Sequence, residues 1–161
     1  MTTSTGFLPH IEGMRALAVI AVIINHLWHD ALPGGYLGVD IFFVISGFVI
    51  TRSMMARPSP SLLSGLAEFY VRRIKRIVPA LVLVVLVTLP LLRLVNPNAD
   101  SATLTGLGAL FGASNIFLYL VASDYFGEAI TLNPFMHTWS LGVEEQFYLV
   151  FPLVFLFVAG R

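Results

Sequence analysis

Two ionisable residues inside the first long apolar segment, residues 11–28, have a spacing that could support chemistry within a membrane. Arg15 and His26 are separated by eleven positions. This is about three helical turns, which places both side chains on one helix face about 16.5 Å apart along the axis. Ionisable residues in membrane helices are costly and commonly mark substrate or proton pathways. Because imidazole is suited to proton transfer near neutral pH, His26 is a candidate general base for a hydroxyl acceptor.

The same spacing also fits a second interpretation. His26 could be an interfacial residue beside Asn25 and Trp28. Arg15 would then extend its side chain to the phosphate groups of cytoplasmic lipids. The sequence leaves both interpretations open.

The second apolar segment contributes a carboxylate and a small notch. Asp40 follows Gly34-Gly35 by about one turn, at a depth similar to that of His26. It could orient the imidazole and stabilise its protonated form, or interact with the positive end of its own helix. Ser46 and Gly47 lie deeper in the same segment. No base is apparent beside Ser46, so close packing is favoured over a role as nucleophile.

A basic cluster and an acidic pair follow later in the chain. Arg72, Arg73, Lys75 and Arg76 offer hydrogen-bond donors for phosphate, although anchoring to anionic lipid is the alternative.

Glu144 and Glu145 come soon after Trp139. A carboxylate in a first helical turn interacts favourably with the helix dipole, which accounts for one of them. Since adjacent helical residues point about 100° apart, a polar channel or a basic ligand would account for the other.

Composition indicates the elements that must position these residues. Hydrophobic residues make up 57% of the 161 residues and charged residues 11%, whereas soluble domains have about 25% charged residues. The sequence predicts an all-α, polytopic transmembrane helical bundle with about five spans of about 20 residues each. The predicted spans are 11–28, 36–55, 77–95, 102–121 and 140–159, with a basic amphipathic interfacial helix over 62–77.

The distribution of basic residues predicts orientation. Six of the nine Lys and Arg residues fall between Arg52 and Arg76, so the N-terminus and this region are expected on the cytoplasmic side of the inner (plasma) membrane. By parity, residues 122–139 are expected there as well.

The absence of cysteine excludes disulfides, the four His lack metal-ligand spacing, and no soluble nucleic-acid-binding fold accompanies the basic run. We therefore expect no metal site and no nucleic-acid partner.

Four stretches of the chain together resemble the acyltransferase-3 family of integral membrane acyltransferases, whose members O-acylate cell-envelope glycans. The first-helix Arg-x10-His motif of the family is similar to IEGMRALAVIAVIINH. The second-helix FFxxSG motif is similar to GGYLGVDIFFVISGFVI, and the basic RxxR segment is similar to FYVRRIKRIVPAL. A stretch that opens a later helix is similar to NPFMHTWSLGVEEQFYLVFP. The four stretches follow the family order, and the resemblance extends over nearly the whole chain.

The resemblance implies that an acyl group, expected to be acetyl, moves from cytoplasmic acyl-CoA to a hydroxyl of an extracytoplasmic glycan such as a polysaccharide or lipopolysaccharide. Arg15 and His26 are expected to be essential, and Arg73 and Arg76 to help bind the donor. Acyl-CoA is a co-substrate, and no bound cofactor is expected. Family domains have about ten spans, so the chain is expected to be the N-terminal part of a larger domain whose remaining half, with any esterase-like domain, completes the site.

These considerations define the predicted site. Catalysis is assigned to His26, Arg15 and Asp40. Binding of acyl-CoA or acceptor is assigned to Arg72, Arg73, Arg76, Ser46, Glu144, Glu145 and Trp139. Direct transfer and an acyl-histidine intermediate both remain open. The alternative function is a proton-coupled transporter or a lipid-binding membrane module, which predicts no binding of coenzyme A.

Overall fold

The computed structural model describes residues 8–55, 62–97, 99–123 and 130–159, which are mainly helical and contain no β-strand. The chain forms two compact units, residues 1–60 and 61–161. Within the described ranges, four helical stretches are long and apolar enough to cross a membrane. These stretches are Pro9–Leu27, Pro33–Met55, Leu63–Val95 and Met136–Val158. The predicted class, an all-α transmembrane bundle, is confirmed. Arg57 of the basic region lies outside the described residues.

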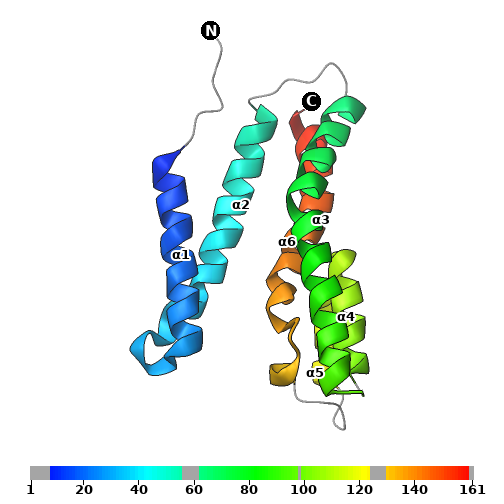
Figure 1. Ribbon diagram of the computed structural model, residues 1–161. Helices are drawn as coiled ribbons and strands as arrows, with labels where there is room; N and C mark the ends of the chain where they lie inside the picture. Colours follow the sequence, from blue (N-terminus) through cyan, green and yellow to red (C-terminus); the bar gives the residue numbers. More distant parts are fainter. Residues whose placement is uncertain (1–7, 56–61, 98, 124–129, 160–161) are drawn as a thin grey trace. The chain divides into compact units, whose positions relative to one another are not determined.

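The first unit is a hairpin of two helices, α1 (Pro9–Leu27) and α2 (Gly38–Met55), joined by the short 3-10 turns η1 (His29–Ala31) and η2 (Pro33–Leu37) (Figure 1). The helices approach closely because glycines face α1. A Cβ atom at Gly38 would lie 2.5 Å from the carbonyl oxygen of Ala18, and one at Gly35 would overlap the carbonyl oxygen of Ala21. Small residues are a common means of close helix contact in membranes.

Asn25 fixes the connection between the two helices. Its amide nitrogen donates hydrogen bonds to the carbonyl oxygens of Leu32 at 2.9 Å and Pro33 at 3.2 Å. The side chain is buried, so these bonds satisfy a polar group that would otherwise be costly to place there. The last turn of α1 is therefore tied to the backbone that leads into α2.

The second unit begins with α3 (Leu62–Val95), a continuous helix of 34 residues. The sequence predicted an interfacial helix over 62–77 followed by a separate span over 77–95. Instead, the two segments form one helix that contains Pro79 and Pro90. Both prolines are exposed. Membrane helices tolerate an internal proline where neighbouring groups or local adjustments satisfy the freed carbonyl group, so Pro79 does not mark a helix start here.

The predicted span 102–121 is wrong, because the chain breaks there into α4 (Asp100–Leu110) and α5 (Ser114–Ser123). Gly112 has a positive φ of 66°. The Gly112 and Ala113 amides donate to the carbonyl groups of Ala109 and Gly108, at 3.2 and 2.9 Å. This is the glycine-terminated helix end known as a Schellman motif. At 1.5 Å per residue each helix is only about 15–17 Å long, about half of a hydrocarbon core.

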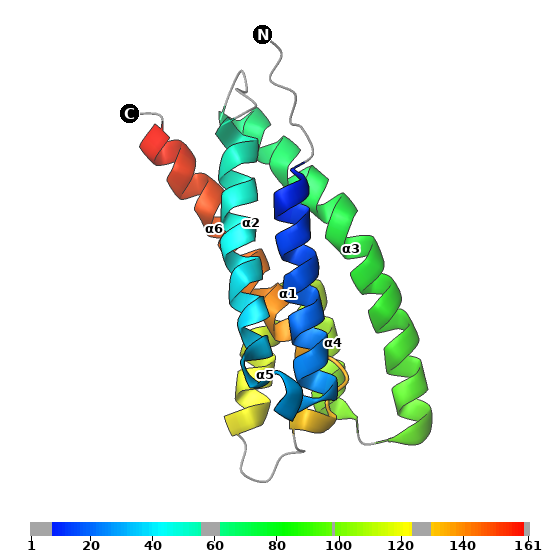
Figure 2. The same cartoon turned by 90° about the vertical axis from the view of Figure 1, so that its left-hand side faces the viewer.

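The two short helices form a hairpin in which α4 packs against α3 and α5 packs against α4 and α6 (Figures 1 and 2). The chain therefore leaves α5 at the same end of the unit at which it enters α4. The prediction that residues 122–139 lie on the cytoplasmic side was based on a single crossing over 102–121. The structure does not form that span as one helix, so the parity argument no longer supports that prediction.

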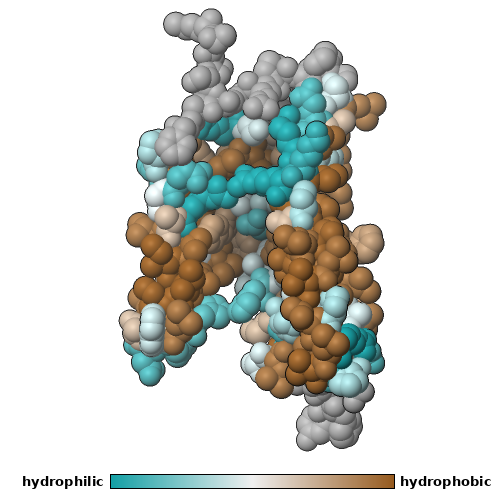
Figure 3. Space-filling view, in the orientation of Figure 1, coloured by the Kyte–Doolittle hydropathy of each residue, from teal (hydrophilic) through white to brown (hydrophobic). Residues whose placement is uncertain are grey.

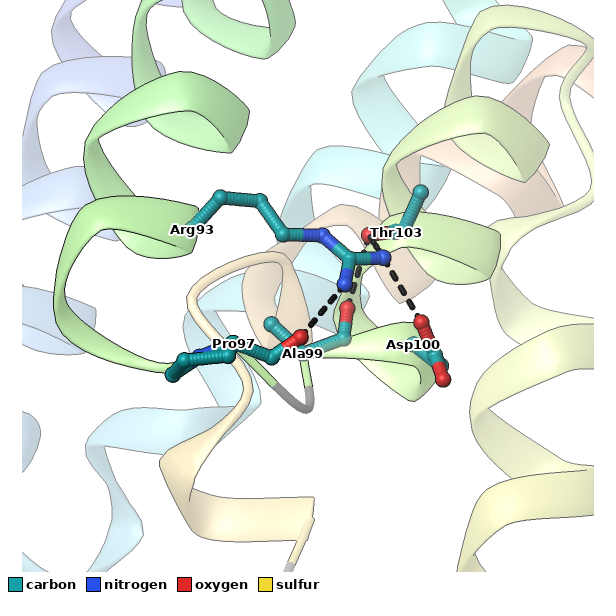
Figure 4. Close-up of polar contacts among 5 residues, drawn as sticks. All are labelled: Arg93, Pro97, Ala99, Asp100 and Thr103. Atoms are coloured by element: carbon teal, nitrogen blue, oxygen red, sulfur yellow. Dashed lines mark hydrogen bonds and ion pairs between the residues drawn. The ribbon is translucent and has the colours of Figure 1, made fainter.

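Arg93 fixes the turn between α3 and α4. Its guanidinium donates to the carbonyl oxygen of Pro97 at 2.6 Å, to Asp100 Oδ1 at 2.7 Å and to Thr103 Oγ1 at 3.1 Å (Figure 4). The Thr103 hydroxyl in turn donates to the carbonyl oxygen of Ala99 at 2.7 Å. One side chain thus joins the end of α3 to the first turn of α4.

After the hairpin, η3 (Ile130–Leu132) and η4 (Met136–Thr138) lead into α6 (Trp139–Ala159). Phe135 between them is almost fully buried and belongs to a core of Leu81, Val85, Ala99, Ala102 and Ala109. Asn133 donates to Thr105 Oγ1 at 3.0 Å and accepts a 3.0 Å bond from the amide of Phe135. Hydrogen bonds to α4 and to the neighbouring backbone therefore satisfy the polar side chain of Asn133 in this irregular segment, and Phe135 packs against α4.

Exposed side chains along the helices are largely hydrophobic (Figure 3). Leu17 and Val44 in the first unit, and Leu83 and Leu149 in the second, are at least 60% exposed. Such extended apolar surfaces are unusual in soluble monomers. They fit helices that face lipid or further membrane helices.

Candidate functional site

Arg15 and His26 lie on the same uninterrupted helix, α1, as the predicted face requires. Arg15 Nη1 donates to Glu12 Oε1 at 3.3 Å, with the Arg15 side chain 29% and that of Glu12 51% exposed. Sequence reasoning did not single out Glu12, although the three-residue spacing of opposite charges on a helix is a recognisable signal. An ion pair this exposed contributes little to stability.

The His26 ring is oriented by its own helix. Its Nδ1 lies 2.8 Å from the carbonyl oxygen of Val22. A carbonyl group can only accept a hydrogen bond, so Nδ1 carries the hydrogen and Nε2 is the basic nitrogen of the neutral ring. The backbone of α1 therefore favours the tautomer with the hydrogen on Nδ1, and catalysis by His26 stays a prediction.

Asp40 lies in the first turn of α2 and is exposed. This position fits a favourable interaction with the helix N-terminus. A hydrogen bond between Asp40 and His26 stays a prediction. Ser46 lies further along α2 and is buried, which fits the packing role favoured from the sequence. Its part in substrate binding stays a prediction as well.

In the second unit the basic residues of α3 have different surroundings. Arg72 donates to Glu68 Oε2 at 3.4 Å, and both side chains are exposed. Arg76 is exposed. Arg73 instead lies over aromatic rings, with its guanidinium carbon 3.9 Å from the centre of the Tyr148 ring and 5.9 Å from that of Phe69.

Tyr148 connects two predicted site residues. The ring is 4% exposed, and its hydroxyl donates a 2.6 Å hydrogen bond to Glu144 Oε2. The structure therefore brings Arg73 and Glu144 together through a residue that sequence reasoning missed. The spacing of Glu144 and Tyr148 by four residues on one helix was the available signal.

Glu145 faces a different neighbour from Glu144, as adjacent residues on a helix must. A Cβ atom at Gly112 would lie 2.6 Å from Glu145 Oε2. The next residue, Gln146, donates to the carbonyl oxygen of Gly112 at 3.0 Å and to Asn115 Oδ1 at 2.9 Å. These contacts place polar groups of α6 against the break between α4 and α5.

Trp139 is the first residue of α6. Glu144 and Glu145 therefore lie in the second turn, beyond the first turn that the dipole explanation assumed. Trp139 is 41% exposed, and its role in binding stays a prediction.

Comparisons with known proteins agree on one family. The family model described as "Acyltransferase domain" matches residues 8–161. The O-acetyltransferase OatA of Staphylococcus aureus strain NCTC 8325 / PS 47 is 40% identical over 159 residues, covering 98% of this chain and 26% of that protein. OatA of strain MRSA252 has the same identity and coverage. The chain thus spans about a quarter of the length of these curated relatives. No solved structure gives a significant match.

Proposed function

Because the chain belongs to the acyltransferase-3 family of membrane acyltransferases, we propose that it forms part of an enzyme that moves an acetyl group from acyl-CoA to a hydroxyl group of a cell-envelope glycan. The matched relatives are named O-acetyltransferases, which supports an acetyl group and an oxygen acceptor. The chain covers only part of such a protein, so the remaining segments complete the walls of the site and bind the acceptor.

One observation carries this proposal, namely the hydrogen bond from His26 Nδ1 to the carbonyl oxygen of Val22. It makes Nε2 the proton acceptor on an apolar helix that also contains Arg15. In the proposed reaction Nε2 takes the proton of the acceptor hydroxyl while its oxygen attacks the thioester carbonyl. The carbon–sulfur bond then breaks, and the imidazolium returns the proton to the departing coenzyme A thiolate. Direct transfer and transfer through an acyl-histidine both use this nitrogen.

The remaining residues have supporting roles in the proposal. Arg15 stabilises the donor near the cytoplasmic end of α1, and Asp40 stabilises the imidazolium. The phosphate groups of coenzyme A bind to Arg72, Arg73 and Arg76, since guanidinium groups match phosphate with paired hydrogen bonds. The routes of donor and acceptor are lined by Ser46, Glu144, Glu145 and Trp139. The N-terminus and the basic part of α3 lie on the cytoplasmic side of the inner membrane.

The test uses the full-length protein in membranes supplied with labelled acetyl-CoA. A His26→Gln variant removes the base, and we expect acetylation of envelope glycan to fall by about 100-fold or more. The matched control is His10→Gln, an exposed histidine in the first turn of α1, which should acetylate at the wild-type rate. Mass analysis of the glycan measures both variants.

Wild-type rates from His26→Gln would contradict the assignment of the base. A wild-type protein that neither hydrolyses nor transfers the label would contradict the acyltransferase itself. That second result would favour a transporter or lipid-binding module.

A further inference from the structure

Arg73 differs from its basic neighbours in being packed between helices. Its guanidinium lies over the Tyr148 ring at 3.9 Å, and Phe69 lies one turn before it on α3 with its ring centre 5.9 Å away. Both rings are at most 5% exposed. A cation over the face of an aromatic ring is attracted by the ring quadrupole, and more strongly where water is excluded.

The hydroxyl group of Tyr148 also makes a hydrogen bond within α6. Its hydroxyl donates to Glu144 Oε2 at 2.6 Å, one turn back on α6. This short hydrogen bond to a carboxylate oxygen restrains the Tyr148 side chain from swinging away from α6. Because Tyr148 is buried, the packing around the ring restrains the face that supports Arg73.

The N–H groups of a guanidinium lie in the plane of the group, and the Tyr148 ring contacts Arg73 at its central carbon. These in-plane donors form the fork that matches two phosphate oxygens. Holding the side chain in one conformation also reduces the entropy lost when a ligand binds. Within the described part of the chain, no aromatic ring supports Arg72 or Arg76 in this way: Arg72 makes an exposed ion pair with Glu68, and Arg76 is exposed.

We propose that Tyr148 is a positioning residue for donor binding, which holds the Arg73 guanidinium ready for a phosphate group of coenzyme A. This inference rests on the proposed function and adds a residue to it. It assigns the Arg73–Tyr148–Glu144 group to affinity for the phosphate-bearing part of the donor and not to the chemistry of transfer.

The test compares two thioesters on the full-length protein. Acetyl-CoA has phosphate groups, whereas S-acetylpantetheine has the same thioester without them. Tyr148→Leu should raise KM for acetyl-CoA by about tenfold with kcat within about twofold, because the cation–π contact is lost. The same variant should leave kcat/KM for S-acetylpantetheine unchanged. Tyr148→Phe keeps the ring and should raise KM for acetyl-CoA by only about twofold.

Two further variants separate positioning from folding. Arg73→Lys keeps the charge but loses the planar fork, so it should behave like Tyr148→Leu. Tyr70→Phe removes a 2.9 Å hydrogen bond from Tyr70 to the carbonyl oxygen of Leu149, which joins the same two helices. It should behave as wild type with both thioesters.

The results distinguish the possible failures. Equal losses on both thioesters, or a Tyr148→Leu variant with wild-type KM for acetyl-CoA, would overturn the positioning role while leaving the acyltransferase intact. If Tyr148→Leu does not accumulate in membranes, Arg73→Lys decides between the same outcomes. A wild-type protein that does not consume acetyl-CoA would overturn the proposed function and this inference together.

Discussion

The Ser114 hydroxyl donates a 2.6 Å hydrogen bond to the carbonyl oxygen of Thr138, which joins the first residue of α5 to the residue that precedes α6. Gly142 lies against the same place, since a Cβ atom there would be 2.9 Å from Ser114 Oγ and 2.7 Å from Asn115 Oδ1. Two helix starts and one irregular segment therefore meet inside the second unit. Non-helical backbone at membrane depth is tolerated where protein surrounds it or where it lines a polar cavity.

The first prediction concerns the break itself. Gly112 has a φ of 66°, a conformation that costs an L-residue roughly 1–2 kcal/mol, and a Cβ atom would also meet Glu145 at 2.6 Å. We expect Gly112→Ala to lower the free energy of unfolding by about 2 kcal/mol or more. Thermal unfolding of the full-length protein in detergent measures the loss.

Gly13→Ala is the matched control for Gly112→Ala. Gly13 lies inside α1 with nothing within 4 Å of its would-be Cβ. Alanine favours a helix over glycine by up to about 1 kcal/mol, so this variant should be neutral or more stable. Equal stability of both variants would show that the break does not depend on the conformation of Gly112.

The second prediction concerns the approach of α1 and η2. A Cβ atom at Gly35 would overlap the carbonyl oxygen of Ala21 and lie 2.7 Å from Asn25 Cβ. Gly35→Ala should therefore cost about 1–3 kcal/mol through overpacking. The neighbouring Gly34→Ala is the control, because its nearest atom, Leu37 Cδ1, is 4.0 Å away. Unfolding midpoints of the two variants measure the difference, and coincident midpoints would contradict the close approach.

The third prediction separates Arg15 from its ion pair. In the Arg15–Glu12 pair the Glu12 side chain is exposed and that of Arg15 is partly exposed, so Glu12→Gln should leave glycan acetylation within about twofold of wild type. Arg15→Gln removes the charge proposed to contact the donor and should lower acetylation by about tenfold or more. Label transfer from acetyl-CoA measures both. Parallel losses in the two variants would mean that Arg15 acts only through Glu12.

Local patterns in the sequence predicted the helical class and the Arg15–His26 face, because apolar length and helical periodicity depend only on neighbouring residues. The break at Gly112 was missed since a glycine inside an apolar run of small residues resembles a close-packing helix. What distinguishes it is a non-local contact, the bond from Gln146 to the Gly112 carbonyl oxygen. Tyr148 was missed for the same reason, because its partner Arg73 lies on another helix.

The fourth prediction tests which end of the second unit each loop occupies. The chain contains no cysteine, so single cysteines can be introduced into it one at a time. Any cysteines elsewhere in the full-length protein are first replaced. Leu132 and Leu63 are both 79% exposed, and Pro97 follows the end of α3. Because α4 and α5 together return to the end at which they begin, Pro97→Cys and Leu132→Cys should react with an impermeant maleimide from the same side of the membrane. Leu63→Cys, at the start of α3, should react only from the other side.

This labelling pattern distinguishes a hairpin from a crossing. A single span over 102–121 would place positions 97 and 132 on opposite sides, so one of them would be protected in sealed vesicles of either orientation. Labelling of both positions from the extracytoplasmic side would also agree with the cytoplasmic placement of the basic residues near the start of α3. Under that orientation Leu132, in the irregular segment before α6, lies at the side on which the proposed glycan acceptor lies, whereas Arg73 and Arg76 lie nearer the cytoplasmic supply of acetyl-CoA.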